Sequence, residues 1–271
     1  MTSRGLLLPA LAAYGVLLLW PLAGVLWTSI TPDGSVGLSA YTRFLSDALF
    51  LSVLRRTVVL SLITTALTLV LSFPIALFLS QSWRRGRTLV TFAIIAPMLV
   101  SAVARSYGWI IILGPAGILS RCFAALGLGS GHLLYTETGI VIASVHLLLP
   151  LMVLPIAGSL QQIDPSLIRA ARILGAGATW TLFRVTLPMC VPGMTAGAVI
   201  VFCMCASSFV TPALIGGPTI PMMSFVIYQQ AIQLIDWPFA SATAFILLAA
   251  TASVTLAYLL WVGTRRAGAR P

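Results

Sequence analysis

Long apolar runs alternate with short polar segments along the whole chain. A hydrocarbon core of roughly 30 Å needs about 20 apolar residues in a helix to cross it, and six runs are that long. They lie near residues 5–29, 57–80, 89–113, 138–162, 190–212 and 239–263. The first run follows Arg4 as a signal peptide would, but its length and the lack of an A-x-A-like cleavage site before Thr31 favour a retained span. The pattern predicts an all-α membrane protein with six transmembrane helices in a single domain, residues 1–271.

Composition supports a lipid environment. Of the 271 residues 59% are hydrophobic and only 7% are charged, which leaves too few charges for a water-soluble surface. The net charge is +10, and all fifteen basic residues are arginines in short clusters between the apolar runs. Such spacing is typical of membrane topology and not of a phosphate-binding face, so we expect the bilayer, and no nucleic acid, as a partner.

Arginine counts predict the orientation, because positive residues gather on the cytoplasmic side. With the N-terminus inside, that side carries ten arginines: Arg4, Arg84, Arg85, Arg87, Arg169, Arg172, Arg184, Arg265, Arg266 and Arg270. The other side carries four: Arg43, Arg55, Arg56 and Arg121. Arg105 falls within the third run. We therefore expect both termini and the loop of residues 163–189 to be cytoplasmic.

Several chemistries are excluded or disfavoured. The chain has no lysine, so neither a P-loop nor a Schiff-base site can be built from it. Cys122, Cys190, Cys203 and Cys205 lack metal-ligand spacing and are interpreted as packing residues, while His132 and His146 are too isolated for a metal site. We expect no catalytic residue, metal or cofactor in this chain.

The polar segment 164–188 has the pattern of a helix followed by a turn. Asp164 before Pro165 is a helix start, with the carboxylate as cap and proline at the first helical position. An apolar face then follows at helical spacing: Leu167, Ala170, Ala171 and Leu174. Gly175 ends this predicted helix of residues 165–175.

A second short helix is predicted before the fifth run. Gly177 permits a turn, Thr179 is placed as the cap, and Pro188 marks the approach to the span. Two hypotheses fit this helix–turn–helix equally well by pattern alone. It is either an amphipathic loop lying on lipid headgroups or a docking element for a partner protein.

Sequence resemblance separates these two hypotheses. The stretch "RAARILGAGATWTLFRVTLP" resembles the loop motif of ABC-transporter permease subunits, a Glu-Ala-Ala triplet with a later glycine and a distal aliphatic-x-Leu-Pro. The matching positions are Ala170, Ala171, Gly175, Val185, Leu187 and Pro188. Arg169 stands where the family has its acidic residue, so the contact made there must be altered, inverted in charge or supplied elsewhere.

The resemblance extends over nearly the whole chain and indicates the spermidine/putrescine-type branch. It is carried by "YTRFLSD", "VARSYGWIIILG", "LLLPLMVLPI", "SSFVTPALIGGP" and "IYQQAIQLIDWPFASA". It implies a type I importer permease fold in a bacterial inner membrane, a second homologous permease, an extracytoplasmic solute-binding protein, and two ATP-binding subunits that bind the ATP and Mg²⁺. The residues it assigns to coupling with those subunits are Leu167, Arg169, Ala170, Ala171, Leu174, Gly175, Leu187 and Pro188.

The solute and its path are less constrained by the sequence. The branch implies a polyamine or a related amine, and candidate path residues are Arg105, Tyr107, Trp109 and Phe209. A cation at Arg105 would repel a polyamine, so it is either structural, which we favour, or a sign of an anionic or zwitterionic solute such as an opine or aminophosphonate.

Two rival classes of protein are disfavoured by the positions of the ionisable residues. A secondary transporter would place ionisable acids within the spans, but Asp33, Asp47, Glu137, Asp164 and Asp236 all lie outside them. A membrane-bound enzyme is weaker still, since no acid, base, nucleophile or metal ligands cluster together. Gly193 and Gly197 form a G-x-x-x-G at the start of the fifth run, a pattern that can permit close helix packing.

Overall fold

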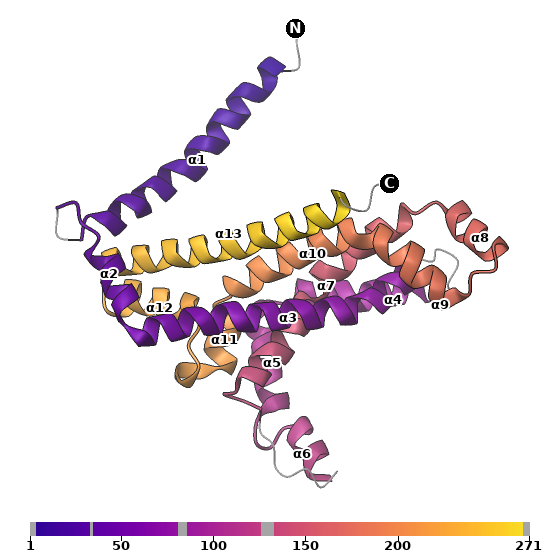
Figure 1. Ribbon diagram of the computed structural model, residues 1–271. Coiled ribbons are helices and arrows are strands. Elements are labelled where there is room, and N and C mark those ends of the chain that lie inside the picture. The colour runs from indigo at the N-terminus through magenta and orange to yellow at the C-terminus, as the bar shows by residue number, and fades with distance from the viewer. Residues whose placement is uncertain (1–3, 33–34, 81–85, 126–132, 268–271) are drawn as a thin grey trace. The chain divides into compact units, whose positions relative to one another are not determined.

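The computed structural model describes residues 4–32, 35–80, 86–125 and 133–267, and every regular element within them is helical (Figure 1). The predictions made for Asp33, Arg84, Arg85, His132 and Arg270, and for the side chains of Arg4, Cys122, Arg265 and Arg266, lie outside the described residues. The α-helices are α1 Arg4–Ile30, α2 Ser39–Ser46, α3 Ala48–Ser80, α4 Arg87–Ile95, α5 Ala102–Leu113, α6 Ile118–Ala125, α7 Glu137–Gln161, α8 Pro165–Ile173, α9 Ala178–Thr181, α10 Leu187–Ala206, α11 Val210–Ile215, α12 Met223–Tyr228 and α13 Trp237–Ala267.

Within the described residues, six helical stretches are long and apolar enough to cross a membrane, as the fold prediction requires. They are Ala13–Ile30, Ala48–Ser80, Ala102–Arg121, Glu137–Gln161, Ala178–Ala206 and Trp237–Thr264.

The third span differs from the predicted run of residues 89–113. The run is divided into α4, a 3₁₀ turn at Ala96–Leu99, and α5. Pro97 has no N–H for the helix ladder, and Val100 is extended. The Ser101 hydroxyl then caps α5 by accepting the Ala104 N–H at 3.2 Å. The apolar residues continue without interruption from α4 to α5, but the backbone hydrogen-bond ladder of the α-helix breaks between them.

The fifth span is shifted toward the N-terminus relative to the predicted run of residues 190–212. The helix already begins at Ala178 and passes through a π turn at Leu182–Thr186 into α10. Pro188 cannot donate to the ladder, which accounts for the wider turn before it. At the other end α10 stops at Ala206, and residues up to Ile215 form the separate helix α11.

The residues of the chain group into two compact units. Unit 1 comprises residues 1–55 and 223–250, and unit 2 comprises residues 56–222 and 251–271. Helices α3 and α13 each contribute residues to both units.

The core of unit 1 is built on three aromatic rings. Phe44 stacks on Phe50 with 5.7 Å between ring centroids, and Phe50 lies 4.9 Å from Phe239. Arg43 lies 4.2 Å over the Phe239 ring and binds Asp236 at 2.8 Å. Because Asp236 also accepts the Phe239 N–H, it fixes the start of α13 against α2.

Unit 2 is packed around α7, which carries buried side chains such as Met152 and Ile156 along most of its length. The α3 helix faces this core with a row of small hydroxyl side chains, all fully buried: Thr57, Ser61, Thr64, Thr68 and Ser72. Their spacing of three and four residues places them on one helix face. Small side chains let membrane helices approach closely, so this row is a packing surface that sequence hydropathy does not reveal.

The predicted G-x-x-x-G lies at the contact between α7 and α10. A Cβ on Gly193 would collide with the Pro155 carbonyl oxygen and lie 2.6 Å from the Ser159 hydroxyl. A Cβ on Gly197 would lie 2.7 Å from the Met152 sulfur. Gly193 is therefore required by the closeness of the two helices, whereas the flexible Met152 side chain could move away from a Cβ at Gly197.

Candidate functional site

The segment between α7 and α10 has the helix–turn–helix form that its sequence predicts (Figure 1). Asp164 caps α8 by accepting the Ser166 N–H at 2.8 Å, and Pro165 is the first helical residue, which confirms both predictions. Gly175, just beyond the end of α8, has φ of +84°, a conformation that favours glycine. The cap predicted at Thr179 is wrong. Gly177 precedes α9 instead, and Thr179 lies within that helix.

One side of α8 packs against the core of unit 2, to which it belongs, and its other sides are exposed. Ile168 packs against the core cluster that contains Leu160 and Ile163, whereas 87% of Leu174 and 85% of Ile173 remain accessible. The inward residue Ile168 is absent from the apolar face predicted from spacing. The end of α8 thus carries two highly exposed apolar side chains beside a polar segment.

A hollow of about 500 Å³ lies between α8, the turn and α9. It is lined by Ala171, Leu174, Gly175, Ala176, Gly177, Trp180 and Val185. Four of these seven residues are glycine or alanine, and Trp180 has the largest side chain of the seven. Leu187 and Pro188, also assigned to coupling, do not line the hollow but form the start of α10.

The charged side chains of residues 164–188 are mostly arginines. Arg169, Arg172 and Arg184 are all exposed, and none makes an ion pair within the described residues. Asp164 is the only acid of the segment, and the hydrogen bond from the Ser166 N–H, helped by the Ser166 side chain and by Arg169, lowers the pKa of its carboxyl. We name the exposed surface of residues 164–188 the coupling face.

Three of the four residues proposed for the solute path lie on α5, and the fourth precedes α11, which packs against α5. Trp109 donates its indole N–H to His146 Nδ1 at 3.3 Å, and the two rings meet edge to face. The Arg105 Nε is buried without a hydrogen-bond partner among the described residues. Tyr107 is more than half exposed, and Phe209 immediately precedes α11. His146 is a path candidate that sequence analysis missed, although an isolated histidine within an apolar span is a usable signal.

The described acids are engaged away from Arg105. Asp236 binds Arg43, Glu137 binds Arg56 at 3.0 Å, Asp47 accepts the Leu49 N–H, and Asp164 caps α8. No ion pair of Arg105 with a described carboxylate is therefore formed. Its neighbours are instead Ser106, whose hydroxyl lies 3.4 Å from that of Thr211, and the Trp109–His146 pair.

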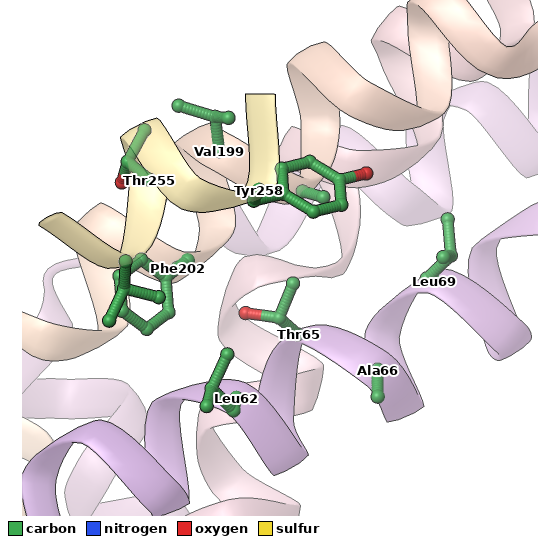
Figure 2. Close-up of a pocket in the computed structure, with 10 residues that line it drawn as sticks. Leu62, Thr65, Ala66, Leu69, Val199, Phe202, Thr255 and Tyr258 are labelled. Carbon is green, nitrogen blue, oxygen red and sulfur yellow. The ribbon is translucent and has the colours of Figure 1, made fainter. Parts of the chain in front are cut away.

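A second hollow, of about 230 Å³, lies within unit 2 among α3, α10 and α13 (Figure 2). Figure 2 shows Leu62 and Thr65 on α3 opposite Phe202 on α10 and Tyr258 on α13. Its ten lining residues carry no ionisable acid or base other than the phenol of Tyr258. The Thr65 hydroxyl is already bonded to the Ser61 carbonyl. This hollow suits apolar groups and offers nothing for a charged solute.

Comparison with known proteins identifies the family. Residues 48–264 match the family described as binding-protein-dependent transport system inner membrane component. The chain belongs to this family. The match covers α3 to nearly the end of α13, and so includes both the coupling face and the residues proposed for the path.

Individual relatives of the chain are also permease proteins of transport systems. The spermidine/putrescine transport system permease protein PotB of Escherichia coli K12 is 34% identical over 230 residues, covering 84% of this chain and 82% of PotB. A putative 2-aminoethylphosphonate transport system permease protein, PhnU of Salmonella paratyphi A, is 27% identical and covers 89% and 84%. The fold matches a crystal structure of a bacterial alginate ABC transporter in complex with a periplasmic protein that carries an alginate pentasaccharide, with a TM-score of 0.80, 19% identity, and coverage of 94% and 91%.

Proposed function

We propose that this chain is the transmembrane permease subunit of an ATP-driven, binding-protein-dependent importer in a bacterial inner membrane. It forms half of the translocation path with a second homologous permease and receives solute from an extracytoplasmic binding protein. Two separate ATP-binding subunits hold the ATP and Mg²⁺, so this chain is not itself an enzyme. The observation that carries the proposal is the family match over residues 48–264, which includes an exposed, partly apolar coupling face.

The coupling face transmits motion because it is exposed on one side and packed on the other. Leu174 and the hollow are available to an ATP-binding subunit, while Ile168 packs against the cluster of Leu160 and Ile163. When the two ATP-binding subunits close together, α8 moves with the subunit on which it is seated. The packed contacts pass this rigid-body motion to α7 and α10, and the path opens to the other side.

Leu174→Asp tests the coupling function. A carboxylate at the hollow would be desolvated by an apolar partner surface, so the ATP-binding subunits should dissociate or lose coupling while the membrane helices stay folded. Retention of these subunits after affinity purification and ATP-driven uptake into proteoliposomes measure the effect. Leu45→Asp, at an exposed leucine of α2, is the matched control and should retain both. Uptake driven by an ion gradient without ATP would contradict the importer mechanism.

A polyamine is the solute that the relatives support best. PotB is a spermidine/putrescine permease and is more similar to this chain than PhnU is. An amine-bearing zwitterion such as an aminophosphonate or opine is the second candidate, favoured by Arg105, which has no carboxylate partner among the described residues. Competition of putrescine, spermidine and 2-aminoethylphosphonate for uptake by the complete complex separates the two.

A further inference from the structure

The second half of α13 packs loosely against the rest of unit 2. From residue 251 onward this helix belongs to unit 2, yet none of residues 248–264 is buried. In the same unit, α7 carries buried side chains along most of its length. The hollow of about 230 Å³ lies between α13 and the two helices that it faces, α3 and α10 (Figure 2). This hollow accounts for the loose packing of α13.

The hollow lies at the depth of lipid acyl chains. All of its lining residues belong to three of the spans. Tyr258 precedes Trp261 by one helical turn, Trp261 is 53% exposed, and arginines follow at positions 265 and 266 of the sequence. Tryptophan and arginine at the end of a span are typical of the headgroup level. At about 1.5 Å per residue, Tyr258 and Val254 lie roughly 5–10 Å deeper along the helix, where the bilayer consists of acyl chains.

The lining of the hollow disfavours both water and a charged solute as its occupant. The Thr65 hydroxyl donates to the Ser61 carbonyl at 2.7 Å, and the Thr255 hydroxyl lies 3.7 Å from the Cys203 sulfur. Both threonine hydroxyls thus already have a partner in the protein. Apolar cavities stay dry, because a buried water needs about two to four polar partners. A charged solute would lose its hydration here without any compensating contact.

A thin and flexible apolar group fits the hollow better than a helix of another protein does. Lipid tails are as apolar as the lining, so binding inside a bilayer depends on van der Waals contacts and gains nothing from the hydrophobic effect. A rigid helix lying across the opening would fill the hollow with a side chain at most. A lipid acyl chain can enter lengthwise and contact the walls formed by α3, α10 and α13.

We propose that this hollow is a binding site for one acyl chain of a membrane phospholipid, and that the bound chain packs the second half of α13 against α3 and α10. The headgroup of that lipid stays at the level of Trp261, so the site selects an acyl chain and not a headgroup charge. None of the lining residues belongs to the coupling face or to α5 and α11, which carry the path candidates. The site is therefore separate from both.

Photolabelling in a bilayer tests this site. The complete importer complex, purified through a tag on this chain, is reconstituted with phosphatidylethanolamine that carries a diazirine midway along one acyl chain. On irradiation the diazirine loses N₂, and the resulting carbene inserts into an adjacent C–H or O–H bond. Mass spectrometry of peptides then measures the label on Tyr258 at the hollow. Leu260 is the internal reference, because it is 61% exposed on the same helix and does not line the hollow.

Variants that fill the hollow give the decisive comparison. Ala66→Phe on α3 should lower the labelling of Tyr258 about fivefold by occupying the space of the chain, and leave that of Leu260 unchanged. Val199→Phe fills the hollow from α10 and should have the same effect, so the result does not depend on the folding of one variant. The matched control is Ala257→Phe, at an exposed alanine of α13 outside the hollow, which should leave both labels unchanged.

Two outcomes of the photolabelling overturn the proposal. Labelling of Tyr258 that neither filling variant lowers would come from bulk lipid that passes by the helix. Labelling of Leu260 without labelling of Tyr258 would show that protein, such as the second permease, covers the hollow.

Thermal stability gives an independent measurement. Adding phosphatidylethanolamine to the delipidated complex should raise the melting temperature of this chain, because a ligand that binds only the folded state stabilises it. The rise should be smaller for Ala66→Phe, whose own side chain takes the place of the acyl chain, and unchanged for Ala257→Phe. An equal rise in all three proteins would show that no acyl chain supports α13 at the hollow.

Discussion

Single glycines determine how closely the helices of unit 2 pack. We expect Gly193→Ala to destabilise the protein by about 1–3 kcal/mol, because the added methyl would meet the Pro155 carbonyl oxygen and the Ser159 hydroxyl. Thermal unfolding of the purified protein measures the loss. Gly158→Ala in α7 is the matched control, since nothing lies within 4 Å of its added Cβ. Equal melting temperatures for the two variants would contradict this account of the α7–α10 contact.

Residue-scale predictions succeed where a residue has one possible role. Asp164 and Gly175 could be assigned from sequence, because a cap and a left-handed end are local requirements of α8. Ile168 could not, because periodicity defines an apolar face but not the direction in which the rest of the protein lies. The functional roles of Arg169, Arg105 and Trp109 stay predictions.

At the scale of an element, α8 depends on the ionised form of its cap. The hydrogen bond from Ser166 lowers the pKa of the Asp164 carboxyl below its ordinary value of 3.8. A carboxyl with a lowered pKa stabilises the folded helix above its unfolded pKa, and this stabilisation is lost as the pH falls through the folded value. We therefore expect α8 to loosen only at pH values below about 4.

A nitroxide label at an Ile173→Cys variant in lipid nanodiscs reports this loosening as increased mobility in electron paramagnetic resonance spectra. Asp164→Asn provides the control, because asparagine caps helices well but does not titrate. Its mobility should stay constant over the same pH range. A label in the Asp164 protein that is equally mobile at pH 7 and pH 3 would exclude the cap as the stabilising group.

Element boundaries were less predictable from sequence than the elements themselves. The runs of residues 89–113 and 190–212 are continuously apolar, yet Pro97 interrupts the first and the second ends early at Ala206. Hydropathy measures the free energy of transferring side chains from water to lipid, whereas a helix ends where its backbone hydrogen-bond ladder is broken. Pro97 accounts for the first boundary, but proline alone would not have predicted it, because Pro74 and Pro150 lie inside the continuous helices α3 and α7.

For the whole molecule, the arginine distribution predicts the orientation, with ten on the cytoplasmic side and four outside. We expect a membrane-impermeant maleimide to label Arg184→Cys only after the inner face is exposed, as in inverted vesicles. Arg43→Cys should be labelled in intact spheroplasts. The native Cys190 and Cys205 are buried, and Cys122 and Cys203 are replaced by serine to remove their background. Labelling from the opposite sides would reverse the predicted topology.

The number of membrane helices was predictable at this scale, because six long apolar runs have no stable place in water. The division into two units was not predictable. It follows from contacts such as Arg43 with Asp236, which are 193 positions apart in sequence and leave no periodic signal.

The hydroxyl row on α3 has a mechanical consequence. Thr68 donates to the Thr64 carbonyl of its own helix, and the bond from Ser72 across to the Leu149 carbonyl of α7 is long, at 3.5 Å. The Ser61 and Thr64 hydroxyls are buried without a hydrogen-bond partner among the described residues. A helix contact with few strong hydrogen bonds across it can shift by shear without breaking many of them. The small hydroxyl side chains thus let α3 pack closely against α7, and a sliding motion of the two helices would have few hydrogen bonds to break.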